Sequence, residues 1–187
     1  MKLVNIMKWK FDMKKQLFVA TILSTSLFSS VNVFAEDGRI NFVGSITDEA
    51  CTVVNNPGNP LTVTLGTVNR TSLDGGAGKT AAPTSFAIKL TDCPSTVTSA
   101  TVKFDGKSAN GDNTALALTA DTDVATGVGI QITDAQNAIV PLYTDSSVYD
   151  LVQGENSLNF VARYLSIADK VEAGPANSTS QFTIAYN

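Results

Sequence analysis

Two cysteines are the side chains of this sequence best suited to covalent chemistry. Cys51 and Cys93 are the only cysteines among the 187 residues, and the sequence contains no histidine. Two thiols without histidine provide too few ligands for a zinc site. Both cysteines lie in the part of the chain that is expected to be exported, so the sequence favours a disulfide that closes one loop.

Three other patterns could indicate chemistry, and each lacks a required part. The run Gly75-Gly-Ala-Gly-Lys-Thr80 resembles a phosphate-binding loop, but that motif needs a glycine where this chain has Leu73. Asp121 and Asp123 offer oxygen ligands without the terminal bidentate carboxylate of a calcium loop. The absence of histidine removes the commonest general base. We therefore predict no enzyme, no catalytic residue, no cofactor and no metal site.

Residues 1–35 have the three parts of a secretory signal peptide. Lysines 8, 10, 14 and 15 form a basic start, residues 17–28 an apolar run, and Val33-Phe34-Ala35 a cleavage site. The start codon is left open among Met1, Met7 and Met13. The apolar run is too short to span a bilayer, so we expect an exported product without stable membrane insertion.

The expected mature chain, residues 36–187, has the size of one domain. The whole sequence has 13 basic and 17 acidic residues, and removing the signal takes away five lysines and one aspartate. Eight basic and sixteen acidic side chains remain, a net charge of minus eight. This balance argues against nucleic-acid binding, which requires clustered basic side chains.

Apolar residues return at every second position in many short segments of the mature chain, separated by polar turns. Such alternation is typical of strands with one buried face, and many short strands in one domain predict a β-sandwich. The expected strands contain Leu61, Val63 and Leu65; Phe86, Ile88 and Leu90; Val102 and Phe104; Val128, Ile130 and Ile132; Leu158, Phe160, Ala162 and Tyr164; and Phe182, Ile184 and Tyr186.

The same alternation occurs close to the expected mature N-terminus, where Ile40, Phe42, Gly44 and Ile46 share one face of an extended segment. An apolar strand at a free end suggests a subunit that joins another subunit. From the pattern alone, an ordinary first strand that pairs within its own domain deserves about equal weight.

Several motifs resemble those of the pilins of the chaperone/usher pathway, and the chain looks like a type 1 fimbrial (major) subunit. The motifs are Gly38-Arg-Ile-Asn-Phe-Val-Gly44 leading to Asp48-Glu-Ala-Cys51; Phe86-Ala-Ile-Lys-Leu-Thr-Asp-Cys93; Gly127-Val-Gly-Ile-Gln-Ile-Thr133; Asn159-Phe-Val-Ala-Arg-Tyr164; and an end with Gly174 fourteenth from the terminus and Tyr186 penultimate.

The resemblance implies an incomplete immunoglobulin-like sandwich that lacks its last strand, with a disulfide between Cys51 and Cys93. Residues 36–48 are expected to be a donor strand, and residues 49–187 the sandwich body. The implied donor residues are Gly38, Ile40, Phe42, Gly44 and Ile46, and the implied chaperone and acceptor groove residues are Gly174, Phe182, Ile184, Tyr186 and Asn187.

The implied partners are a periplasmic chaperone, an outer-membrane usher and neighbouring pilin subunits. The chaperone would fill the groove with its own strand, and its basic residues would hold the carboxylate of Asn187. At the usher, the donor strand of the next subunit would take its place. The expected product is a surface fimbrium that supports cell adhesion and biofilm formation.

Two alternatives stay open. Only Glu36 and Asp37 precede Gly38 in the expected mature chain, which is typical of minor tip or adaptor pilins, whereas residues 159–164 resemble a main shaft subunit. A monomeric secreted module of immunoglobulin-like fold is less favoured, and its ligand site would lie near Asp121 and Asp123.

Overall fold

The computed structural model describes residues 38–44, 46 and 50–187. The predicted signal peptide, residues 1–35, lies outside the described residues. Contacts divide the chain into one unit that ends at Ser45 and a second that begins at Ile46. We call residues 38–46 the tail and residues 50–187 the body.

The body is built almost entirely of β-strands. In chain order its elements are β1 (Thr52–Val53), the 3-10 helix η1 (Arg70–Ser72), β2 (Thr80–Cys93), β3 (Ser99–Asp105), β4 (Val128–Asp134), β5 (Tyr149–Asp150), β6 (Gly154–Ser166) and β7 (Gln181–Tyr186). Five of these strands contain the alternating runs that predicted them. Within the part of the chain that the structure describes, no helix is long and apolar enough to cross a membrane.

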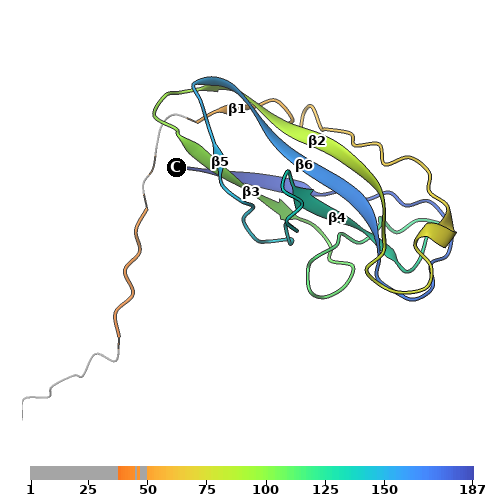
Figure 1. The fold of residues 1–187 in the computed structure, drawn as a ribbon. Coiled ribbons are helices and arrows are strands. Elements are labelled where there is room, and N and C mark those ends of the chain that lie inside the picture. Colours follow the sequence, from red (N-terminus) through yellow and green to blue (C-terminus); the bar gives the residue numbers. More distant parts are fainter. Residues whose placement is uncertain (1–37, 45, 47–49) are drawn as a thin grey trace, which may run out of the picture. The chain divides into compact units, whose positions relative to one another are not determined.

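The strands form two antiparallel sheets (Figure 1). The four-stranded sheet has the order β1-β2-β6-β4, and the three-stranded sheet has the order β5-β3-β7. Neighbouring strands of the three-stranded sheet are far apart in the sequence. In particular, β7 at the end of the chain pairs with β3. The predicted all-β sandwich is confirmed.

Aromatic side chains from both sheets meet in the centre of the sandwich. Phe160 of β6 packs its ring 5.1 Å from that of Phe104 on β3 and 5.7 Å from that of Phe86 on β2. Ile88 and Leu158 are each only 1% exposed in the same cluster. Each such fully buried apolar side chain stabilises the fold by about 1.5 to 3 kcal/mol.

Strand β2 is long and is interrupted twice by irregularities in its pairing with β6. The register shifts between Ala81 and Thr84 and again between Leu90 and Cys93. Ala82 and Asp92 adopt positive φ values of 52° and 55° at these two places. Such bulges increase the local twist of a strand, and the second one lies directly before Cys93.

One predicted strand is wrong. No strand is present at Leu61, Val63 and Leu65, although Val63 and Leu65 do pack against the core. Alternating burial requires only that one side of the segment faces the sandwich. A strand also needs a neighbouring backbone to hydrogen-bond with, and no backbone–backbone hydrogen bond joins residues 61–68 to the rest of the described chain.

Candidate functional site

Strand β7 forms an open edge of the three-stranded sheet. It pairs with β3 from Gln181 to Tyr186, and no second strand of the described chain pairs with its other side. Its burial alternates: Phe182, Ile184 and Tyr186 are half-buried against the core, and the residues between them are exposed. An edge strand with unpaired backbone groups is a template for another strand.

A second segment of the body, separate from β7 in sequence, also lacks a strand partner. Residues 61–68 place Val63, Leu65 and Val68 half-buried against the core. The backbone of this segment makes no backbone–backbone hydrogen bond within the described chain. Strand β7 and residues 61–68 therefore both lack a strand partner on one side, and both place apolar side chains against the core of the sandwich.

A cavity of about 350 Å³ is lined by residues 66–68 and by residues 171–177, which precede β7 in the chain. Gly66 and Val68 line it on one side, and Gly174 and Ala176, which precede β7, line it on the other. Its walls also include four side chains buried in the body: Leu73, Val128, Tyr164 and Val171. These apolar side chains could contact an inserted apolar side chain, although charged and polar residues also line the cavity.

Tyr164 is one of several polar residues on the wall of this cavity, which Thr67, Arg70, Glu172 and Asn177 also line. Its hydroxyl donates a long hydrogen bond of 3.5 Å to the carbonyl oxygen of Gly66. Burial raises the pKa of Tyr164, so the side chain stays neutral at physiological pH. It ties the 61–68 segment to β6.

The structure gives a local reason for glycine at position 174. A Cβ atom there would lie 2.1 Å from the carbonyl oxygen of Asp123 and 2.6 Å from the amide nitrogen of Ala125. The neighbouring amide of Ala125 donates to the carbonyl oxygen of Pro175 at 3.0 Å. Gly174 thus allows two backbones to approach closely at the rim of the cavity.

The C-terminal residues are fixed to the start of β3. The amide of Asn187 donates to the carbonyl oxygen of Ser99 at 2.9 Å, and its main-chain oxygen accepts from the amides of Thr98 and Ser99. The hydroxyl of Tyr186 is buried and has no hydrogen-bond partner among the residues that the structure describes, and burial raises the pKa of Tyr186. The residues predicted for the groove thus lie along one edge, with Gly174 at the cavity beyond β7.

The tail exposes its apolar side chains. Phe42 is 92% exposed and Val43 is 97% exposed, and Ile40 and Ile46 are also largely solvent-accessible. No strand is assigned to the described residues 38–44 and 46. A Cβ atom at Gly38 or Gly44 would meet nothing within 4 Å.

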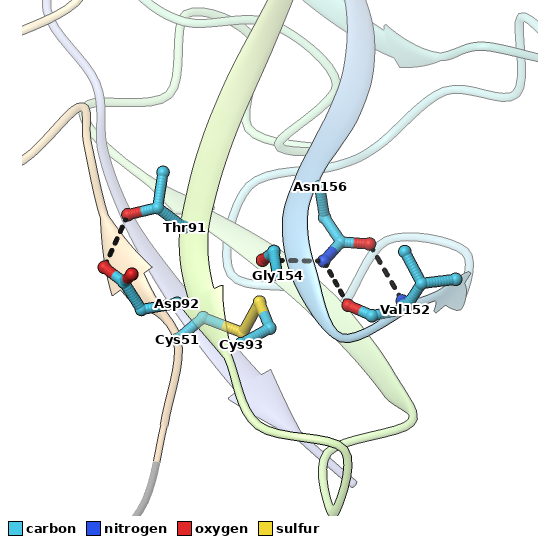
Figure 2. The surroundings of a disulfide bond; sticks show 7 residues. All are labelled: Cys51, Thr91, Asp92, Cys93, Val152, Gly154 and Asn156. Carbon is cyan, nitrogen blue, oxygen red and sulfur yellow. Dashed lines mark hydrogen bonds between the residues drawn. A yellow bond between two sulfur atoms is a disulfide. The ribbon is translucent and has the colours of Figure 1, made fainter.

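The predicted disulfide is present between Cys51 and Cys93 (Figure 2). Both cysteines are buried, and the bond links the residue before β1 to the last residue of β2. Beside it, the side chain of Asn156 accepts from the Val152 amide at 2.9 Å and donates to the Val152 carbonyl at 2.7 Å (Figure 2). These bonds hold the turn that enters β6.

The acidic loop considered as an alternative ligand site is exposed at Asp121 and Asp123. The Asp121 carboxylate accepts a hydrogen bond from the amide of Thr122 at 2.7 Å. Among the described residues, no group of three or more His, Cys, Asp or Glu side chains is arranged to hold a metal ion.

Comparison with known proteins identifies the family. A sequence model described as "Fimbrial protein" matches residues 40–187. This chain belongs to the fimbrial protein family. Among its relatives is the fimbrial-like protein SfmA of Escherichia coli K12, which is 36% identical over 182 residues and covers 92% of this chain and 99% of that protein. Long polar fimbria protein A of Salmonella typhimurium is 33% identical over 178 residues, covering 95% and 99%.

Solved fimbrial structures share the fold. The type I fimbria protein of Burkholderia pseudomallei is 34% identical, with a TM-score of 0.57 and coverage of 79% of this chain and 96% of that one. The P pilus rod subunit PapA is 20% identical, with a TM-score of 0.61 and coverage of 73% and 99%. At that identity PapA supports the fold alone, that of a pilin sandwich.

Proposed function

We propose that this fimbrial protein is a structural subunit of a chaperone/usher fimbria and polymerises by donor-strand exchange. In this proposal, residues 36–48 of one subunit add a strand to the open edge of β7 in the next subunit. Residues 49–187 form the accepting body. The observation that carries the proposal is the open edge of β7, whose outer side pairs with no strand of the described chain.

The side chains of the tail are suited to this edge. Strand addition uses backbone hydrogen bonds for affinity and alternate side chains for register. Ile40, Phe42 and Ile46 would face the groove, and burying each contributes about 1.5 to 3 kcal/mol. Each new backbone hydrogen bond adds about 0.5 to 1.5 kcal/mol, offset in part by the ordering of the tail. Gly44 is suited to a shallow position of the groove.

The open edge also needs protection before assembly, since an exposed apolar edge promotes aggregation. We assign that role to a periplasmic chaperone that fills the groove with its own strand and binds the carboxylate of Asn187 through basic side chains. An outer-membrane usher would then exchange the chaperone strand for the tail of the next subunit. The product is a cell-surface fimbrium that serves adhesion and biofilm formation.

The proposal is tested with a variant that should keep the ability to accept a strand but lose the ability to donate one. A truncated chain that begins at Asp48 should still accept a strand from an intact subunit, but it should not donate one. Mixed with chaperone, usher and intact protein, it should enter filaments only at the end where no donor is needed. Electron microscopy shows where the truncated chain enters the filaments, and electrophoresis of the unboiled polymers measures how much of it is incorporated.

A matched pair of point variants shows whether polymerisation depends on one face of the tail or only on its overall hydrophobicity. Phe42 and Val43 are almost equally exposed in the tail, but only Phe42 is on the face of Ile40 and Ile46. We expect Phe42→Asn to reduce polymer yield at least tenfold and Val43→Asn to leave it nearly unchanged. Equal effects of the two substitutions, or undiminished polymerisation of the truncated chain, would show that the tail is not the donor.

A further inference from the structure

A second cavity, of about 610 Å³, lies on the outer face of the four-stranded sheet. Its floor includes Gln131 of β4 and Leu165 of β6, and it shares no lining residue with the cavity beside Gly174. Its volume falls within the range of about 300 to 1,000 Å³ that is usual for small-molecule sites.

A hairpin attached to β4 builds one wall of this cavity. Leu116 and Ile130 exchange two backbone hydrogen bonds of 2.8 and 3.0 Å, and the amide of Ala109 donates to the carbonyl oxygen of Ala115 at 2.9 Å. The hairpin therefore extends the sheet beyond β4, and its tip, residues 110–114, reaches the outer face. Asn110, Asp112 and Thr114 line the cavity from this tip.

Gln131 presents a polar side chain to this cavity. Ile130 and Ile132 face the core, so Gln131 points to the opposite face of β4, where it is only 7% exposed. Its carboxamide makes no hydrogen bond to any residue that the structure describes. The nitrogen and oxygen of this carboxamide are not sealed from solvent, so they are available to a molecule in the cavity.

Asn110 supplies a second unused group. Its amide nitrogen donates to the Thr114 hydroxyl at 2.8 Å, whereas its side-chain oxygen is buried without a partner. At the rim, one oxygen of Asp112 accepts from the Thr114 amide at 2.9 Å and from the Thr114 hydroxyl at 2.7 Å. These hydrogen bonds, the backbone one first, lower the pKa of Asp112, so its carboxylate is charged at neutral pH.

The lining defines the chemistry of the ligand. No lysine or arginine lines the cavity, which argues against an anion. Two carboxamides, one carboxylate and the Thr80 hydroxyl offer both donors and acceptors, as a hydroxyl-rich ligand requires. Ile139 and Leu165 supply aliphatic surface for its C–H groups. We propose that this cavity binds an uncharged polyhydroxylated molecule of the size of a monosaccharide unit, held by Gln131, Asn110 and Asp112.

The test uses the full chain and simple sugars as probes. Isotope-labelled protein is titrated with the methyl glycosides of mannose, galactose and N-acetylglucosamine, and the side-chain amide signals of Gln131 and Asn110 are followed by NMR. At least one glycoside should shift both signals in a saturable way. If none does, no sugar site exists here and the proposal is wrong.

Variants show whether the binding depends on the Gln131 carboxamide. Gln131→Leu should weaken the binding roughly tenfold, because one buried hydrogen bond is lost. Gln153→Leu, a matched change at an exposed glutamine outside the cavity, should leave the affinity unchanged. Sugar binding that is equally strong in Gln131→Leu would overturn the assignment.

A second variant covers the case in which Gln131→Leu does not fold, and it also tests for a cationic ligand. Asp112 is exposed, so Asp112→Asn removes the charge without disturbing the core. We expect it to weaken glycoside binding by a few-fold. If methylammonium chloride shifts the same signals in place of the glycosides, and Asp112→Asn abolishes that shift, the cavity is a cation site and the proposal fails.

Discussion

Gly174 shows how a single residue shapes the rim of the proposed groove. A side chain at this position would overlap the backbone between Asp123 and Ala125. We expect Gly174→Ala to destabilise the isolated chain by about 1 to 3 kcal/mol, the usual cost of overpacking. Urea unfolding measures the change. Gly38→Ala is the matched control, because nothing lies within 4 Å of a Cβ there.

The same substitution should also reduce acceptance of a donor peptide that contains residues 38–48, because the cavity rim is displaced. Unchanged stability and unchanged peptide binding in Gly174→Ala would contradict the close approach of the two backbones.

Sequence reasoning found some residues of the site and missed others. Gly174 and Tyr186 were implied by the resemblance to pilins, and β7 was predicted through its alternation. Gln131 was not singled out, since a polar residue between two isoleucines looks like an ordinary solvent-facing position. Only the hairpin that covers the outer face of β4 makes it buried, and that contact joins residues whose proximity no local pattern reveals.

The disulfide joins the start of the body to the end of β2, the longest strand. Its two cysteines are separated by 42 positions, and on the chain-entropy model closure of such a loop stabilises the fold by about 4 kcal/mol. We expect the double variant Cys51→Ala, Cys93→Ala to lose about 2 to 5 kcal/mol in urea unfolding.

Reduction provides the control for that prediction. A reducing agent should lower the unfolding midpoint of the native chain to that of the double variant, and it should leave the double variant unchanged. A loss below 1 kcal/mol would mean that the surrounding bonds, such as those of Asn156, hold this end without the disulfide.

A strand was predictable where the described chain supplies both alternating apolar residues and a neighbouring strand to pair with. In β3 and β6, alternating residues face the core and a neighbouring strand completes the hydrogen bonds. Residues 61–65 have the alternation without the neighbour, so the predicted strand is absent. The two-residue strands β1 and β5 are too short to leave a periodic signal.

At the scale of the whole molecule, the body exposes an incomplete edge and the tail exposes apolar side chains. We expect this chain to form the shaft, so immunogold labelling with antibodies against it should decorate whole filaments. Cells that lack the chain serve as the control. Label confined to filament tips would instead assign it to the minor tip or adaptor subunits.

The three-stranded sheet has a geometric consequence for any polymer built on its open edge. The surface that gives and the surface that receives are different, so the association is heterologous and does not close by a two-fold axis. A filament of such units is directional: one extremity keeps a vacant edge, and the other keeps an unused peptide. Growth at one extremity therefore uses the tail of the incoming unit and growth at the other uses its open edge, so a unit that lacks either surface terminates the chain at one extremity only.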